Sequence, residues 1–251
     1  ADAEYQVPCN SIELDTTGDL TFYAKFTYIP TEDAYFDFTP VTAAELTALG
    51  VTGYENVDAD EVIGYAVSNK GLQLPKYVAF PATELVFEDG GTEQLIIGSQ
   101  AFKGTSIKAL VFPDRGVEIG SSAFYQVSAL ESIDFGEGVV VIGSAAFAAD
   151  SGTNSTAKDP EAFLVTDLMI PANVTSIGAN AFHGQHNIKN LTIAAKTIGD
   201  GAFAMTQLST LTLEEGVETI GKYAFYASNK LGEVSGEYAK GLGQNIASVN
   251  I

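Results

Sequence analysis

The only two histidines of this chain, His183 and His186, lie three residues apart in a segment that predicts a turn. A metal site at this corner would need a nearby carboxylate or third histidine, and the local sequence supplies neither. The sequence has no nucleophile elbow, phosphate-binding loop or zinc-protease motif. We therefore expect surface histidines, no catalytic residue, no metal site and no cofactor.

Oxygen-bearing side chains alternate over residues 56–60, as they do at the start of a calcium-binding EF-hand loop. However, Glu61 replaces the glycine that this loop requires, and Val67 occupies the position of its bidentate acid. The EF-hand interpretation fails, and a looser extracellular cation site stays open. The pair Glu214 and Glu215 falls in a predicted turn, where solvation explains it better than glycoside hydrolysis does.

The charge balance excludes two classes of partner. The 251 residues include 12 basic and 32 acidic ones, which gives a net charge of −20. Nucleic acid and anionic membrane surfaces are both recognised by clusters of Lys and Arg, which this chain lacks. Hydrophobic residues make up 46% of the chain, enough for a sizeable core, but no apolar run approaches the ~18 residues of a membrane span.

Cysteine usage and the start of the chain favour an exported bacterial protein. Cys9 is the only cysteine, so an internal disulfide framework and a cysteine metal cage are excluded, and we expect an inert thiol. The sequence begins at Ala1 without methionine, as expected if an export signal is absent from it. We expect a secreted or cell-surface location.

A repeated frame, Ile-Gly-x-x-Ala-Phe, determines the architecture over most of the chain. Its six phenylalanines are Phe102, Phe124, Phe147, Phe182, Phe203 and Phe225, at intervals of 22, 23, 35, 21 and 22 residues. A period of about 20–29 residues is typical of leucine-rich-repeat solenoids, whose turns stack to bury a shared core. The six rings should therefore stack into one column, with the glycine of each frame allowing a tight bend.

A second frame of the type Leu-x-x-Leu-x-Leu precedes most copies of the first, and its alternation predicts a short strand with one buried side. The exposed positions of these strands should form a concave binding face. The predicted binding residues are Lys108, Val111, Glu131, Asp134, Thr166, Met169, Lys189, Thr192, Thr210 and Thr212. They are small or mixed in charge, which favours a protein partner over a glycan. The aromatic candidates for a glycan platform, Tyr125, Tyr223 and Tyr226, should lie on another face.

Together the two frames resemble the BspA-type leucine-rich repeats of bacterial surface proteins, over about residues 82–235. The common cysteine of that family, three residues after Phe, is replaced in this chain. The replacements are Thr105, Val127, Asp150, Gln185, Thr206 and Ser228. The resemblance implies a mostly β, α/β solenoid: a right-handed leucine-rich-repeat superhelix with short parallel strands and 3-10 or turn segments, capped at both ends. It also implies binding to host matrix proteins or other cells.

The predicted domain organisation has three parts. Residues 1–75 should form an N-terminal cap or small mixed α/β segment, with a strand over 20–28 and a helix that begins at the capping box of Thr42 and Glu45 and ends before Gly50. Residues 76–235 should hold the repeats, with an exposed insertion at about 148–160, and residues 236–251 the C-terminal cap.

We expect a non-catalytic exported repeat protein that mediates protein–protein recognition or adhesion. Two alternatives remain open at this point: a carbohydrate-binding accessory protein of a bacterial surface system, and a structural spacer.

Overall fold

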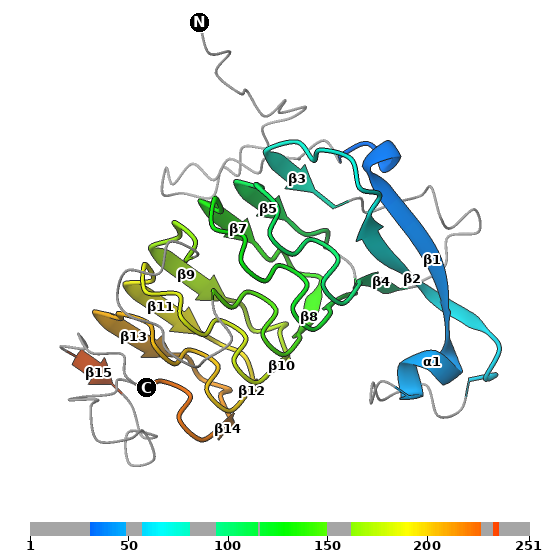
Figure 1. The fold of residues 1–251 in the computed structure, drawn as a ribbon. Helices are drawn as coiled ribbons and strands as arrows, with labels where there is room; N and C mark the ends of the chain where they lie inside the picture. The colour runs from blue at the N-terminus through cyan, green and yellow to red at the C-terminus, as the bar shows by residue number, and fades with distance from the viewer. Residues whose placement is uncertain are drawn as a thin grey trace, which may run out of the picture.

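A solenoid of stacked turns, mostly β, is the architecture of the computed structural model (Figure 1). The structure describes residues 31–48, 57–80, 94–114, 116–149, 162–226 and 233–235. The expected strand at 20–28, Cys9, Gly50 and the segments 150–161 and 236–251 lie outside the described residues.

Each turn contributes one strand to each of two sides of the solenoid. The first side consists of a three-stranded and a four-stranded sheet, in which β5, β7, β9, β11 and β13 come from the Leu-x-x-Leu-x-Leu frames. The three-stranded sheet contains β3 (Tyr77–Ala79), β5 (Ala109–Val111) and β7 (Ser132–Asp134). The four-stranded sheet contains β9 (Asp167–Ile170), β11 (Asn190–Ile193), β13 (Thr210–Leu213) and β15 (Glu233–Ser235).

The other side is a continuous eight-stranded sheet, which the sequence did not predict. Its order is β1-β2-β4-β6-β8-β10-β12-β14. The bounds are β1 (Phe36–Thr42), β2 (Val62–Asn69), β4 (Gln94–Ile97), β6 (Val117–Ile119), β8 (Val139–Ile142), β10 (Ser176–Ile177), β12 (Thr197–Ile198) and β14 (Thr219–Ile220). From β4 onward each strand ends at the Ile of an Ile-Gly pair and a turn follows, so the predicted turns are confirmed.

The predicted column of phenylalanine rings fills the core between the two sides. All six rings are at most 4% exposed. Successive ring centroids lie 5.4, 5.1, 5.1, 5.0 and 5.7 Å apart, with interplanar angles from 3° to 13°. One ring per turn at this spacing gives near-parallel stacking along the whole repeat, which confirms the prediction.

The glycines of the Ile-Gly pairs are required by the distance between turns and not by a bend. None of them has a positive φ among the described residues. A Cβ added to Gly143 would lie 2.6 Å from the carbonyl oxygen of Ile119, and one added to Gly178 would lie 2.5 Å from the amide nitrogen of Ser144. Real Cβ atoms do not approach backbone so closely, so only glycine lets consecutive turns stack here.

The left-handed conformation occurs two residues after each of these glycines. The φ angles there are 57° at Gln100, 56° at Ser122, 52° at Ala145, 56° at Asn180, 64° at Gly201 and 59° at Tyr223. Five of these six residues carry a side chain, although glycine adopts this conformation most readily. The repeat therefore fixes this backbone shape more strongly than it fixes the residue type.

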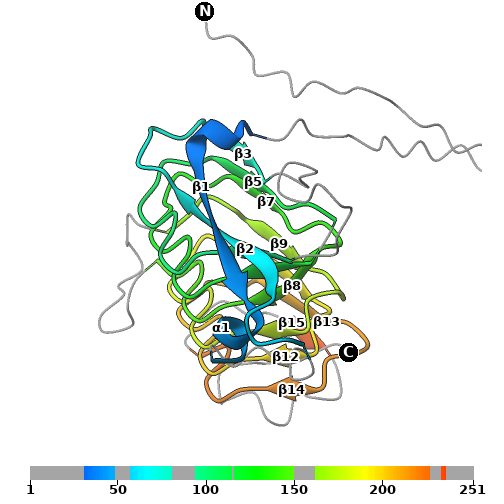
Figure 2. The same ribbon diagram turned by 90° about the vertical axis from the view of Figure 1, so that its right-hand side faces the viewer.

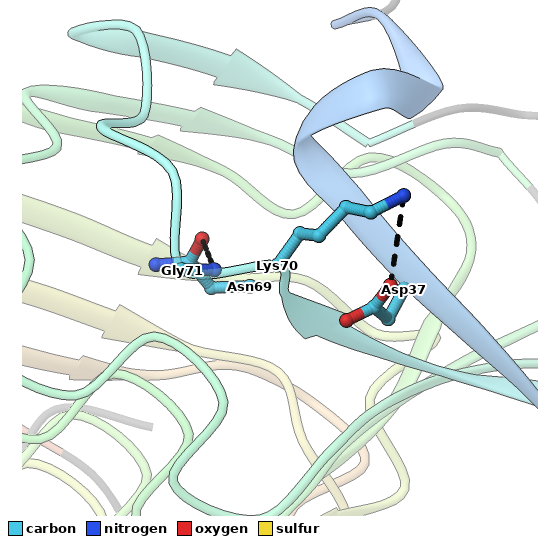
Figure 3. A network of polar contacts seen from close by, with 4 residues as sticks. All are labelled: Asp37, Asn69, Lys70 and Gly71. Carbon is cyan, nitrogen blue, oxygen red and sulfur yellow. Dashed lines mark hydrogen bonds and ion pairs between the residues drawn. The ribbon is translucent and has the colours of Figure 1, made fainter.

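The N-terminal end of the solenoid is covered by a different unit, seen from that end in Figure 2. Strand β1 pairs antiparallel with β2, and β2 pairs in parallel with β4, so the unit continues the eight-stranded sheet. A 3-10 turn, η1 (Asp33–Tyr35), precedes β1. Figure 3 shows the ion pair between Lys70 Nζ and Asp37 Oδ1 (3.8 Å), and the Gly71 amide donating to Asn69 Oδ1 (3.0 Å) just after β2.

The predicted helix is α1 (Ala43–Ala48), and both capping-box hydrogen bonds are present. The Thr42 amide donates to Glu45 Oε2 (2.8 Å), and the Glu45 amide donates to Thr42 Oγ1 (3.4 Å). Ala43 packs with Val41, Ile63 and Ile96 in a second, smaller hydrophobic cluster. This cluster joins α1 to the first strands of the sheet, while the division at residue 75 stays a prediction.

Candidate functional site

The outward-facing side chains of β5, β7, β9, β11 and β13, with the residues that lead into them, form the surface that we call the strand face. It contains all ten predicted binding residues, and none of the ten is buried. In β9 and β13 each exposed position alternates with a buried one. Leu168, Leu191 and Leu211 lie in register and point into the core, so the intervening residues must face outward.

The strand face is divided into two blocks, which the sequence did not predict. Strands β7 and β9 do not pair, and Figure 1 shows them farther apart than neighbouring strands within either sheet. On the other side of the solenoid β8 and β10 pair without interruption, with Ile142 opposite Ile177. The long interval between Phe147 and Phe182 therefore separates the strands on one side only.

Gln185 forms hydrogen bonds with both segments that flank the predicted insertion (about 148–160) at this division. Gln185 is buried, with 1% of its surface exposed. Its Nε2 donates to the carbonyl oxygen of Phe147 (2.5 Å), and its Oε1 accepts from the amide of Phe163 (2.8 Å). Gln185 stands where the repeats that this chain resembles commonly have cysteine, and nothing in the sequence pattern predicted that its amide would bridge two other segments.

Two repeats have threonine at the position equivalent to Gln185. In each of them the threonine hydroxyl donates to the backbone carbonyl three residues earlier in the same repeat. Thr105 Oγ1 donates to the carbonyl oxygen of Phe102, and Thr206 Oγ1 donates to that of Phe203, both at 2.8 Å. In these two repeats this position therefore carries a hydroxyl that is hydrogen-bonded to the backbone.

In the first block the charged residues compensate one another. Lys108 Nζ forms an ion pair with the carboxylate of Glu131, and this hydrogen bond raises the pKa of Lys108. Asp134 is exposed, lies in register with Val111, and accepts a hydrogen bond from the amide of Gly136 at Oδ1 (3.0 Å). Asp134 is therefore an exposed carboxylate of this block that forms no ion pair with the described residues.

In the second block a chain of hydrogen bonds crosses three strands. Thr166 Oγ1 donates to Asp167 Oδ2 (2.6 Å), and Asn190 Nδ2 donates to Asp167 Oδ1 (2.6 Å). Thr210 Oγ1 then donates to Asn190 Oδ1 (2.7 Å). The hydrogen bonds from Thr166 and Asn190 hold the pKa of Asp167 below its ordinary value, because they stabilise the carboxylate.

Asp167 and Asn190 were absent from the predicted site. The signal that could have found them is the parallel register, because Asp167, Asn190 and Thr210 occupy equivalent positions in three consecutive strands. Thr210 alone was predicted. In the other two repeats the predicted residues, Thr166 and Lys189, lie one position before the strand begins.

A second row lies beside this chain, two residues farther along each strand. Met169, Thr192 and Thr212 are in register, and Met169 is 67% exposed. Lys189, which leads into β11, donates from Nζ to the carbonyl oxygen of His186 (2.7 Å) and to Gln207 Oε1 (3.4 Å). Its ammonium group is therefore directed toward its own backbone turn.

The histidine prediction is wrong for His183, which is 7% exposed. It packs in the turn after Phe182, and its carbonyl oxygen accepts from the amide of Ala149 (2.9 Å). His186 is half-buried in the same turn. The interpretation of a surface turn failed because the next turn of the solenoid stacks on this segment.

The described residues hold no group of three or more His, Cys, Asp or Glu side chains placed to bind a metal ion. Within the same residues, no helix has the length and apolar character needed to cross a membrane. Tyr223 and Tyr226 are 73% and 58% exposed, and their ring centroids lie 5.8 Å apart in an edge-on arrangement. They occupy the turn that follows β14, beside Phe225.

Comparison with known proteins agrees with the repeat architecture. Residues 86–159 and 161–241, more than half of the chain, match the family described as BspA type leucine rich repeat region, with six copies. A comparison with curated proteins gave no significant match.

The solved structures that resemble the chain include the following two. The pneumococcal vaccine antigen PcpA is 21% identical with a TM-score of 0.52, over 72% of this chain and 47% of that one. A leucine rich cell surface protein from Faecalibacterium prausnitzii A2-165 is 19% identical with a TM-score of 0.47, over 83% and 55%. The chain thus spans about half the length of these proteins, and the first likeness supports the solenoid fold.

Proposed function

This chain belongs to the BspA-type leucine-rich repeat family, and from that premise we propose that it is a non-catalytic recognition protein that binds a protein partner through the strand face. We further propose that it is exported or displayed on a bacterial surface. The description of PcpA as a vaccine antigen is in keeping with such display.

One observation carries this proposal: the buried positions of the strands repeat while the exposed positions differ. The buried position is Leu in β5, β9, β11 and β13, whereas the outward-facing position that follows it is Val111, Met169 or, in two strands, threonine (Thr192 and Thr212). Parallel register places Met169, Thr192 and Thr212 in one row, about 4.8 Å apart from strand to strand, and places Val111 beside Asp134 in the other block. A regular scaffold with a variable exposed row supplies specificity without a catalytic group.

The test is binding of the purified chain to a panel of host matrix proteins by surface plasmon resonance. We expect Asp134→Lys and Thr212→Arg to weaken the binding of a true partner at least about tenfold, because each places a charge in the surface that the partner must cover. Glu218→Lys, an exposed charge reversal before β14, is the matched control and should leave binding unchanged. Equal affinity of the parent and both strand-face variants would contradict the proposal.

The alternative function, glycan binding, has a specific candidate in the exposed pair Tyr223 and Tyr226. Exposed aromatic rings can pack against apolar faces of a ligand. Binding of the chain to a glycan array that is lost in Tyr226→Ala, and retained in Thr212→Arg, would favour this alternative over the strand face.

A further inference from the structure

The second block of the strand face holds a carboxylate whose orientation is fixed by the protein. Asp167 accepts one hydrogen bond at each oxygen, from Thr166 and from Asn190, and Asn190 is fixed in turn by Thr210. Asp167 itself is exposed. The two ion pairs among the described residues are Lys70–Asp37 and Lys108–Glu131, so neither neutralises Asp167.

A carboxylate keeps acceptor capacity after two such bonds, since its two oxygens together offer about four lone-pair sites. The lowered pKa of Asp167 means that the group stays charged when the solution becomes mildly acidic. Its local hydrogen bonds therefore leave an exposed anion that can accept hydrogen bonds from a cation without first being reoriented.

An apolar surface lies next to this anion at a defined distance. Met169 follows Asp167 by two residues in β9, so the two side chains emerge on the same side about 6.6 Å apart along the strand. Thr192 is in register with Met169 on β11 and is half-buried. The 67% exposure of Met169 is notable because a flexible, apolar side chain of this kind adapts to the surface that covers it.

We propose that Asp167 and Met169 form a binding site for a lysine or arginine side chain from a basic, exposed segment of the partner protein. The cationic head group would bind the carboxylate of Asp167, and the aliphatic stem would cover Met169 and Thr192. Long basic side chains bury their stems on apolar surface while the charged end stays at a polar site. The net charge of −20 favours the approach of such a segment over a neutral or acidic one.

This inference deepens the proposed function and rests on it, because it assigns a partner chemistry to one block of the strand face. The probe is a short peptide of alternating threonine and arginine, titrated into the isotopically labelled chain and followed by NMR. The matched probe carries citrulline, which has the shape of arginine without its charge. We expect the arginine peptide to shift the amide signals of β9, β11 and β13, and the citrulline peptide to leave them unchanged.

Variants then separate this site from general attraction to an acidic protein. Asp167→Asn should weaken the arginine peptide roughly two- to fivefold, as expected for one exposed charge pair. Met169→Thr should weaken both the arginine peptide and a lysine peptide, because both stems lose the thioether surface. Glu218→Gln removes one exposed charge elsewhere and should leave the Kd unchanged. The amide spectrum outside β9–β13 reports that each variant is folded.

The proposal is overturned if the arginine peptide causes no shifts, if citrulline binds as well as arginine, or if Asp167→Asn and Glu218→Gln weaken binding equally. None of these results contradicts the proposed function, because Thr212→Arg would still weaken the binding of a partner with other chemistry. Conversely, if a matrix protein binds every strand-face variant with the affinity of the parent, the proposed function is contradicted even if the peptide binds at Asp167.

Discussion

The glycine of each Ile-Gly pair shows how a single residue sets the spacing of the solenoid. At Gly120, Gly143, Gly178, Gly199 and Gly221 an added Cβ would lie 2.5–2.7 Å from an atom of the preceding turn's backbone. At Gly98 the nearest atom, the carbonyl oxygen of Val67, would be 3.2 Å away, because the preceding strand belongs to the N-terminal unit. The demand for glycine is therefore strongest where one repeat stacks on another.

We predict that Gly143→Ala lowers the free energy of unfolding by about 3 kcal/mol, the upper range for an overpacked core. The neighbours that must move are the carbonyl oxygen of Ile119 and the backbone of Gly120, which no side-chain rotation can relieve. Urea denaturation measures the loss, with Gly98→Ala as the control that should lose less. Equal losses in the two variants would refute the close-approach explanation.

Glu118 gives the chain a pH-dependent stability term. It lies in β6, is 8% exposed, and burial raises its pKa because the charged form loses solvation. A raised pKa in the folded state means that its contribution is fully present below the pKa of the unfolded chain and is lost as pH rises through the folded value. The carboxylate therefore disfavours folding at neutral pH.

We expect Glu118→Gln to raise the Tm at pH 7, where the parent carries the buried charge. The gain should shrink as the pH falls through the raised pKa, because Glu118 then becomes neutral in the folded parent. Thermal unfolding between pH 4 and pH 7 checks both parts. A gain that is constant with pH, or one that Glu218→Gln reproduces, would show that burial of the Glu118 charge is not the cause.

At the scale of elements, the position of Gln185 explains how the repeat accommodates the long interval after Phe147. The side-chain amide of Gln185 donates to the carbonyl oxygen of Phe147 and accepts from the amide of Phe163. A buried backbone group without a partner costs about 1–3 kcal/mol. The glutamine therefore stabilises the junction where the strand face divides.

Gln185→Ala should lower the free energy of unfolding by about 2–4 kcal/mol, because it leaves the Phe147 carbonyl and the Phe163 amide without this partner. Hydrogen exchange at the Phe163 amide should accelerate more than exchange in β13. Gln207→Ala, which removes only a long 3.4 Å bond to Lys189, is the control. Uniform acceleration along the chain would argue against a local junction.

The sequence predicted the elements whose neighbours repeat and missed those that depend on contacts between unlike segments. The phenylalanine column, the short strands and the capping box of Thr42 follow from spacing alone. The pairing of β8 with β10 across the long interval does not, because its strands are set by main-chain hydrogen bonds. The burial of His183 and the bridging role of Gln185 likewise depend on which turn stacks above them.

For the candidate site, the sequence identified exposed strand positions but not how they interact. Parallel register turns Asp167, Asn190 and Thr210 into one hydrogen-bonded chain, and that register emerges only when the turns stack. The pairing of Lys108 with Glu131 also joins neighbouring turns. Residue types could be predicted, whereas the fixed orientation of a carboxylate could not.

At the scale of the whole molecule, the repeats behave as a one-dimensional stack in which each turn holds its neighbours. The phenylalanine column and the eight-stranded sheet run through every repeat, and the N-terminal unit covers the first edge with the antiparallel pair of β1 and β2. Stability is therefore shared along the axis, and it is lowest where a turn loses one of its two strand pairings.

Because β7 and β9 do not pair, we expect this interface between turns to resist mechanical force less than its neighbours do. The turns that contain β9, β11 and β13 are joined by strand pairing on both sides of the solenoid. Between β7 and β9 the strand pairing is on one side only, through β8 and β10, and it is supplemented by the hydrogen bond from the Leu164 amide to the carbonyl oxygen of Leu130, the Gln185 bridge and the ring stack of Phe147 on Phe182. Tethered at one end and pulled by a bound partner at the other, the molecule should extend in two stages. The first rupture would leave both blocks of the strand face folded.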